Sequence, residues 1–395
     1  MNFPTKLYKE GKTSFFAPQL ENYRIPQDAP VFYNPKMEFN RDFSIILAQT
    51  YQKELKDDLS ICDPFSGVGV RGLRYVNEIK EVKSVYINDI DYKAYEIIKK
   101  NIKNLKINKK IKVYNKNAIL LLDKIYSSPE SLDIVDIDPF GSPTSYIDAA
   151  VRSLKKEGII MLTATDMRVL CGLNPESCIR KYGAKPLKKN YCHEIACRIL
   201  LGCLSRIAGR FDYSIAPLIS YSKIHYIREY VHLVRSISKA NKSINNNIGY
   251  ISHCFSCEGR EIFNKITQKP VKCHLCGSKN IKIAGPLWIG KIQNGDFISK
   301  FINNIDGSFS RNKKEIEDLA LLLKEEENMP ATYYNVHNIC KKLKISSPKF
   351  NSIIKSLKES GFKVCKTHFC PLCLKTDANI MELSKIIKNI SQFNV

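Results

Sequence analysis

The sequence predicts an α/β fold built on a mostly parallel sheet, followed by a second, α+β region. The first observation is an alternation of short apolar runs that suit strands with segments of helical periodicity, such as residues 91–105. The second is that most of these runs end in an acidic residue, which is typical of ligand sites beyond the carboxyl ends of parallel strands. The expected strands are residues 59–66, 82–89, 111–114, 132–138 and 158–166.

The sheet is expected to end in an antiparallel pair formed by residues 212–221 and 226–236. The chain then becomes polar and aperiodic over residues 239–249, which indicates a boundary. We therefore expect a first domain of residues 1–238, which includes an N-terminal extension, and a second of residues 239–395.

The second domain is expected to contain three helices, over residues 314–327, 335–344 and 348–360, and a strand-like run over 361–367. Pro348 lies near the start of the third helix and Gly361 ends it. This order resembles a winged-helix unit. The alternative is a helical pair that packs on the first domain.

The chain has 62 Lys and Arg against 39 Asp and Glu among 395 residues, a net charge of +23 that favours a nucleic acid partner. The alternative is an ordinary solvated surface. Mixtures of basic and aromatic side chains suit RNA. Such residues are Tyr182, Lys185, Lys188, Lys189, Tyr191, His225, Tyr226, Arg228 and Tyr230, and a purely basic series follows at Lys341, Lys342, Lys344, Lys349, Lys355 and Lys358.

The N-terminal residues lack the apolar core of a signal peptide, and no window approaches the roughly 18 apolar residues of a membrane helix. We expect a cytoplasmic protein with no membrane segment, and a monomer.

Four of the 14 cysteines have the spacing of a zinc site. Cys254 and Cys257 form one C-x2-C pair, and Cys273 and Cys276 form a second after residues 258–272. Two such pairs at this separation predict a structural zinc ion with four thiolate ligands. The alternative is four core cysteines.

The other cysteines are expected to be thiols, because a reducing compartment disfavours disulfides. Cys370 and Cys373 form a third pair, which cannot complete a tetrahedral site alone and is interpreted as not binding metal. Scattered cysteines in apolar patterns are interpreted as small core residues. These are Cys171, Cys192, Cys197, Cys203 and Cys340.

A glycine-containing loop follows the first expected strand, with Asp63, Gly67 and Gly69. Glycines let the backbone turn sharply and approach a ligand closely. Asp89, at the end of the second strand, suits the hydroxyls of a ribose. The loop lacks a Walker lysine, which argues against ATP. It fits either a nicotinamide or an S-adenosylmethionine site.

The fourth strand leads into Asp138, Pro139 and Phe140, a carboxylate and an aromatic ring on a proline-stiffened turn. The ring offers a stacking face for a base, worth roughly 1–3 kcal/mol. The carboxylate suits an exocyclic amine, whose positive charge at attack it compensates. A strand-end turn with a capping Asp is the alternative.

The segment from Asp138 to Pro143 resembles the motif of the tRNA guanosine-26 N2-dimethyltransferases. Further segments that resemble this family extend over nearly the whole chain. They are residues 32–42, 163–166, 180–183, 193–194, 285–288, 366–368 and 375–377.

The resemblance implies a Rossmann-like class I methyltransferase sheet and a C-terminal tRNA-binding domain with zinc. It implies transfer of one or two methyl groups from S-adenosylmethionine to N2 of guanosine 26 in tRNA. Asp138 would take the guanine amine, and Phe140 would stack on the base.

The resemblance also implies a cofactor site. Its residues would be Phe32, Arg41, Arg71, Asp89, Asn117 and Ala118. Arg41 would pair with the methionine carboxylate, for which a guanidinium is well suited. Asn117 stands where the family usually has an Asp.

Two other functions fit parts of the sequence. An amino-methyltransferase acting on adenine in DNA, or on another RNA, also uses an acidic or amide residue, a proline and an aromatic after the fourth strand. A non-catalytic RNA-binding protein with a relic fold would explain the charge alone. A nicotinamide dehydrogenase would leave the Asp138 motif unexplained.

Overall fold

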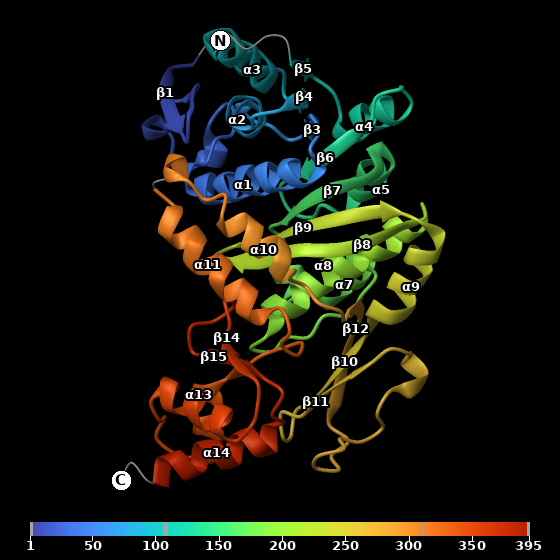
Figure 1. Ribbon diagram of the computed structural model, residues 1–395, viewed down its shortest axis with the longest axis vertical. Coiled ribbons are helices and arrows are strands. Elements are labelled where there is room, and N and C mark those ends of the chain that lie inside the picture. Colours follow the sequence, from blue (N-terminus) through green and yellow to red (C-terminus); the bar gives the residue numbers. More distant parts are fainter. Residues whose placement is uncertain (1–2, 106–109, 310, 393–395) are drawn as a thin grey trace. The chain divides into compact units, whose positions relative to one another are not determined.

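The computed structural model describes residues 3–105, 110–309 and 311–392, which form two compact units (Figure 1). Each unit combines stretches that are far apart in the sequence. The first comprises Met1–Thr163, Tyr230–Val234 and Asp296–Ala320, and the second comprises Ala164–Glu229, Arg235–Gly295 and Leu321–Val395.

The first unit alternates strands and helices after an N-terminal hairpin. Its elements are β1 (Thr5–Glu10), β2 (Thr13–Pro18), α1 (Glu38–Leu55), β3 (Leu59–Asp63), α2 (Val70–Glu78), β4 (Val82–Asn88), α3 (Tyr92–Leu105), β5 (Ile111–Tyr114), α4 (Ala118–Tyr126), β6 (Leu132–Ile137), α5 (Thr144–Ser153), β7 (Leu154–Ala164), α10 (Gly295–Ile302) and the first part of α11 (Lys313–Glu326).

The expected parallel sheet is confirmed. In the described part of the chain it has the order β5-β4-β3-β6-β7, with β9 and β8 completing seven strands. Parallel registers such as Ile61↔Val85 and Ile61↔Ile134 align the strand ends. From β3 the chain adds β4 and then β5 toward one edge of the sheet, and from β6 it adds β7 toward the other. The direction in which strands are added therefore reverses between β3 and β6. Ligands of open α/β sheets bind at such a reversal.

Two features of the first unit were not predicted. The first is the hairpin of β1 and β2, paired antiparallel from Thr5↔Pro18 to Glu10↔Thr13. The second is an aromatic core in which Phe43 of α1 stacks on Tyr230, 5.5 Å between ring centroids, and packs on Phe301 at 4.4 Å. Long-range packing of this kind leaves no local pattern in the sequence.

The second unit contains helices, a long hairpin and two small sheets. Its elements are α6 (Met167–Leu170), α7 (Pro175–Tyr182), α8 (Cys192–Gly209), β8 (Tyr213–Lys223), the ends of β9 (Tyr226–Arg235), whose middle part Tyr230–Val234 belongs to the first unit, α9 (Ile237–Asn247), β10 (Ile248–Cys254), β11 (Arg260–Phe263), β12 (Ile281–Trp288), β13 (Tyr334–Asn335), α12 (Val336–Leu343), α13 (Phe350–Glu359), β14 (Val364–Lys366), β15 (Cys373–Thr376) and α14 (Ile380–Gln392).

The apolar helix α8 organises the second unit. It packs on β8 and on β12, which belongs to the sheet β11-β10-β12. Glu194 on α8 is fully buried and binds Arg198 at 2.9 Å and Lys375 at 2.7 Å. These partners hold the pKa of Glu194 low, at about 2, although burial opposes ionisation. The ion pairs of Glu194 thus join α8 to Lys375, a structural role.

Residues 334–392 have the elements of a winged-helix unit: α12 and α13, then the sheet β13-β15-β14, and α14 (Figure 1). The helices and the sheet share one apolar core, which includes Ile339, Ile353, Leu374 and Leu383. The expected helices and the strand-like run are confirmed within a few residues. A helical pair without its own sheet does not describe this segment.

The polar stretch 239–249 lies mostly in helix α9, whose N-cap Ser236 accepts a hydrogen bond from the Lys239 amide. The domain boundary expected there stays a prediction. One other expectation was wrong. The aromatic residues of the expected RNA-binding clusters, such as Tyr191 and Tyr230, are fully buried. Among residues 3–105, 110–309 and 311–392, no helix is both long and apolar enough to cross a bilayer.

Candidate active site and metal centre

The candidate residues of the first unit lie at the carboxyl ends of adjacent parallel strands. Asp63 ends β3, Asp89 follows β4, and Asp138 follows β6. Asn117 lies beyond β5 and caps α4, where its side chain accepts a hydrogen bond from the Ile119 amide at 2.9 Å. The neighbouring Ala118 is buried in the first turn of α4. These residues thus lie at one edge of the sheet, although Asp63 and Asp138 are 75 positions apart in the chain.

The loop after β3 is shaped around Gly67. Its φ is +53°, and an added Cβ would lie 2.6 Å from the Phe32 carbonyl oxygen, so no other residue fits without strain. The Gly67 amide donates to Asp89 Oδ2 at 2.8 Å, and Asp89 Oδ1 accepts from the Asp91 amide at 3.0 Å. Gly69 precedes α2 as its N-cap. The two loops are therefore fixed to each other.

Asp63 is an unusual carboxylate. It is fully buried, its Oδ2 accepts from the Gly72 amide at 3.2 Å, and its Oδ1 has no hydrogen-bond partner among the described residues. Burial raises the pKa of Asp63 to about 7, against the opposing effect of Arg71. A buried carboxylate oxygen without a donor suits a cationic ligand.

Arg71 of α2 reaches from the cofactor edge to the predicted catalytic acid. Its Nη1 donates to Asp136 Oδ2 at 3.1 Å, and its Nη2 donates to Asp138. Burial alone would lower the pKa of Arg71, but Asp136 and Asp138 together raise it above its ordinary value. Asp138 is therefore positioned by a permanently charged guanidinium.

Sequence reasoning missed the residues that hold Arg71. Asn40 Oδ1 accepts from Nη2 at 2.9 Å, and Ser44 Oγ from Nη1 at 3.1 Å. The i, i+4 spacing of Asn40 and Ser44 places them on one face of α1. Asp136 lies within β6, two residues before Asp138, and also accepts from Tyr75 Oη at 2.7 Å. The only sequence signal for these contacts was the spacing of the polar residues, four positions between Asn40 and Ser44 and two between Asp136 and Asp138.

Phe140 is presented to solvent. Its side chain is 70% exposed, which is unusual for a phenylalanine, while Pro139 before it is buried. Phe32 packs edge-on against it, with ring centroids 4.8 Å apart. Phe32 and Phe140 thus form an edge-on pair of rings, and Phe140 follows Asp138 by two residues.

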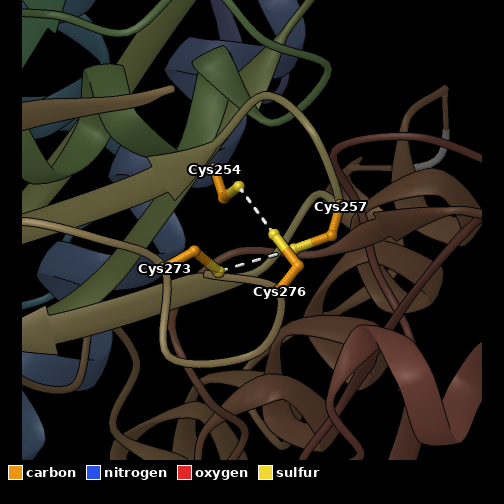
Figure 2. Close-up of side chains that lie close together, drawn as sticks. All are labelled: Cys254, Cys257, Cys273 and Cys276. Carbon is orange, nitrogen blue, oxygen red and sulfur yellow. Dashed lines mark hydrogen bonds between the residues drawn. The ribbon is translucent and has the colours of Figure 1, made fainter. Parts of the chain in front are cut away.

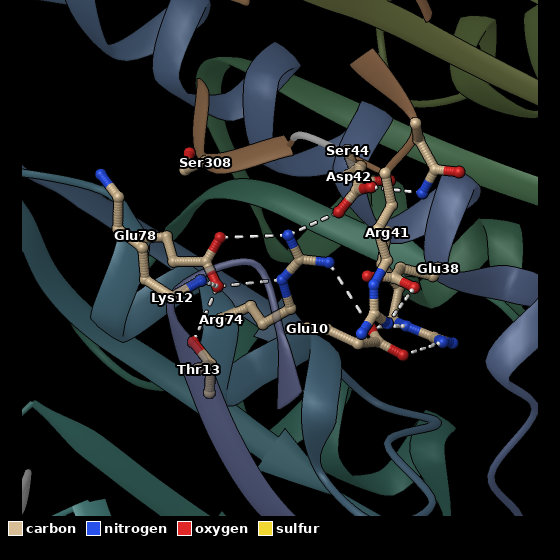
Figure 3. Close-up of polar contacts among 12 residues, drawn as sticks. Glu10, Lys12, Thr13, Glu38, Arg41, Asp42, Ser44, Arg74, Glu78 and Ser308 are labelled. Atoms are coloured by element: carbon tan, nitrogen blue, oxygen red, sulfur yellow. Dashed lines mark hydrogen bonds and ion pairs between the residues drawn. The ribbon is translucent and has the colours of Figure 1, made fainter. Parts of the chain in front are cut away.

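Arg41 belongs to a buried ion cluster, shown in Figure 3. Its Nε and Nη2 donate to both carboxylate oxygens of Glu10, at 2.7 and 2.6 Å. Arg74 is fully buried and contacts Asp42 at 2.6 Å and Glu78 at 3.0 Å. In this structure the Arg41 guanidinium is thus held by the N-terminal hairpin, and its pairing with a methionine carboxylate stays a prediction.

Comparison with known proteins decides the family. The profile described as N2,N2-dimethylguanosine tRNA methyltransferase matches residues 11–388. The chain belongs to this family. Curated relatives named tRNA (guanine(26)-N(2))-dimethyltransferase are 41% identical in Methanobrevibacter smithii, covering 99% of both chains, and 39% identical in Methanosphaera stadtmanae, covering 98% of both.

The fold is shared with a solved member of the same family. The structure of Trm1 from Pyrococcus horikoshii with S-adenosyl-L-methionine superposes with a TM-score of 0.84 at 30% identity, covering 97% of this chain and 99% of that one. The predicted fold class, a methyltransferase sheet, is therefore confirmed.

The four cysteines of this methyltransferase-family chain converge in the second unit, as Figure 2 shows. The Sγ atoms of Cys254 and Cys276 are 3.6 Å apart, and those of Cys257 and Cys273 are 3.5 Å apart. Tetrahedral zinc with Zn–S bonds of about 2.3 Å separates its thiolates by roughly 3.8 Å. The cluster is compatible with a structural zinc ion.

The remaining cysteines differ from expectation at two places. Cys370 and Cys373 form a disulfide, and their Cα separation of 5.3 Å is within the usual range for such a bond. The expectation that all non-ligand cysteines are thiols was therefore wrong for this pair. Cys197, Cys203 and Cys340 are buried as expected, whereas Cys171 and Cys192 are only partly buried.

A groove of about 1260 Å³ in the second unit is lined by basic side chains. It runs between the cysteine loop at Ser256–Glu258 and helices α12 and α14. Its cationic lining residues are Lys189, Arg260, Lys341, Lys342, Lys385 and Lys388, against the acidic Glu258 and Glu382.

Proposed function

We propose that this protein transfers methyl groups from S-adenosylmethionine to N2 of guanosine 26 in tRNA. Family membership and the named activity of its relatives support the reaction. The observation that carries it in this chain is the arrangement of Asp138, fixed by Arg71, beside the exposed ring of Phe140.

The residues at the sheet edge fit the donor. Asp89, whose carboxylate accepts hydrogen bonds from two backbone amides, would hold the ribose hydroxyls, and Asn117 with Ala118 would border the adenine. Asp63 has the unpaired buried Oδ1 that an ammonium group needs. Phe32, Arg41 and Arg71 would complete the site around Gly67 and Gly69. When bound, the sulfonium supplies the electrophilic methyl carbon.

The chemistry on the base side belongs to Asp138 and Phe140. The amine lone pair of guanine is conjugated with the ring, so N2 is a poor nucleophile until it rehybridises. Asp138 would accept a hydrogen bond from N2 and compensate the charge that forms there. Phe140 would stack on the base, and Pro139 would stiffen the turn that carries both. The chain's task is thus positioning and charge compensation.

The basic groove supports the choice of tRNA as partner. Lys341 and Lys342 on α12 and Lys385 and Lys388 on α14 are all exposed, at positions that suit phosphate contacts. These lysines lie in residues 239–395, the expected tRNA-binding domain. The same domain holds the proposed zinc site of Cys254, Cys257, Cys273 and Cys276. We further propose that the enzyme acts as a monomer in the cytoplasm.

The deciding experiment offers the protein labelled S-adenosylmethionine and an unmodified tRNA transcript, a transcript with adenosine at position 26, and duplex DNA. Mass analysis of the digested products identifies the methylated nucleoside. We expect methylated N2 of guanosine from the first substrate only. Methylated adenine in DNA would instead identify the rival amino-methyltransferase, and absence of cofactor binding by calorimetry would identify a relic fold.

A further inference from the structure

We infer that the second unit holds a second metal site, built from Cys171, Cys192 and His193. One ligand atom from each of these three residues lies within 4.8 Å of the other two. Among residues 3–105, 110–309 and 311–392, one other group of His, Cys, Asp or Glu side chains is placed to hold a metal ion. It is the cluster of Cys254, Cys257, Cys273 and Cys276.

The backbone brings the three residues together from two places. Cys171 follows the short helix α6, and Cys192 and His193 begin α8. Gly172 has a φ of +86°, and an added Cβ there would lie 3.0 Å from the Lys188 backbone nitrogen. Glycine at this position allows the loop of Cys171 to lie directly against the segment that leads into α8.

The ligand set selects the kind of ion. Two thiols and one imidazole are the ligands of zinc sites, and hard cations such as Mg²⁺ or Ca²⁺ prefer oxygen. With bonds of about 2.3 Å to sulfur and 2.0 Å to nitrogen, the ligand atoms of zinc lie roughly 3.5–3.8 Å apart. Cys192 Sγ and His193 Nδ1 are 4.0 Å apart, which is close to this separation.

The site differs in character from the four-cysteine cluster. Three protein ligands leave the fourth position of a tetrahedral ion for water, and all three residues are only partly buried. We therefore assign to this site an exchangeable zinc ion, held more weakly than the ion of the four-cysteine cluster. The ion would tie the loop after α6 to the first turn of α8, next to the buried Glu194 ion pairs.

The test begins with metal analysis of the full-length protein expressed in zinc-supplemented medium and purified under reducing conditions. We expect about two zinc ions per chain. Cys171→Ser and Cys192→Ser should each contain about one, and so should Cys276→Ser. Cys203→Ser, a matched exchange of a buried thiol on the same helix α8, should keep two. A wild-type protein with one zinc that Cys171→Ser leaves unchanged would overturn the inference.

A second measurement needs no variant. With zinc bound, Cys171 and Cys192 should resist alkylation by iodoacetamide, and a mild chelator should expose them before it exposes Cys254 or Cys276. Peptide mass analysis reads each residue separately. Equal labelling of Cys171 and Cys192 with and without zinc would contradict the site. A Cys171–Cys192 disulfide in the purified protein would also overturn the metal site, because it would identify these cysteines as a redox pair.

Discussion

Arg71 Nη1 donates to Asp136 Oδ2 at 3.1 Å, and its Nη2 donates to Asp138, the proposed catalytic acid. Asp136 lies within β6, and Asp138 follows the end of that strand. The guanidinium therefore contacts two carboxylates at once. This relationship motivates the first prediction.

Replacing Asp138 by Asn should lower methyl transfer by about 100-fold to 10,000-fold, because a neutral amide no longer compensates the charge that forms on N2. Arg71 would still pair with Asp136, so the fold should persist. Single-turnover assays with tRNA transcript measure the loss, and Asp57→Asn, an exposed residue beyond α1, is the control. Undiminished methyl incorporation by Asp138→Asn would refute the mechanism.

Phe140→Ala should reduce the rate of methyl transfer more than the affinity for tRNA. In the proposed mechanism the exposed ring would stack on a base that has left its helix, a contact worth roughly 1–3 kcal/mol, or about 5-fold to 150-fold in rate. Affinity comes mainly from phosphate contacts elsewhere. Phe140→Tyr, which keeps the ring, should restore the rate. Equal losses in single-turnover and filter-binding assays would speak against base flipping onto Phe140.

Stability should depend on pH through Asp63. Because burial raises its folded pKa to about 7, well above the unfolded value near 3.9, the folded state binds the extra proton between those values. The contribution of Asp63 to the free energy of unfolding is complete below about pH 4 and is lost as pH rises through 7. This contribution is at most roughly 4 kcal/mol.

Urea unfolding from pH 4.5 to 8 measures this effect. The stability of the wild type relative to Asp63→Asn should fall across that range. Saturating S-adenosylmethionine should reduce the slope, since a cation beside Oδ1 favours the charged carboxylate. Parallel pH profiles for wild type and Asp63→Asn would show that Asp63 titrates normally.

Exchanging Lys385 and Lys388 for Gln should weaken tRNA binding and lower the slope of log K against log salt by about 2, if each contacts one phosphate. The matched control exchanges Lys355 and Lys358 on α13, which have the same spacing and exposure but do not line the groove. Both double variants lose the same charge. Identical slopes for the two would mean that net charge, rather than the groove, determines affinity.

Removal of zinc from the four-cysteine cluster should destabilise the second unit. Cys254→Ser leaves three ligands, and the loop between β10 and β12 loses the ion that closes it. We expect a lower Tm and increased proteolysis within residues 255–280, measured by mass mapping, while S-adenosylmethionine binding by calorimetry changes little. An unchanged Tm would indicate that these cysteines act only as packing residues.

The sequence by itself determined the parallel sheet, the acidic residues at its strand ends, the paired C-x2-C loops and the helices of the winged-helix segment. Each leaves a local signal: an apolar run closed by an acid, a fixed cysteine spacing, or an apolar stripe with a capping residue. These signals depend on neighbours along the chain, which is why their bounds agree with the structure within a few residues for β5, α3 and α13.

Only the tertiary structure decided how those residues are used. It joined Glu10 to Arg41 across 31 positions, brought Cys171 to Cys192 and His193, and buried the tyrosines that had looked suited to RNA. Such pairings are set by the packing of distant segments and by the cost of burying a charge without a partner. Neither quantity can be read from residue order, because both depend on which surfaces meet after the chain has folded.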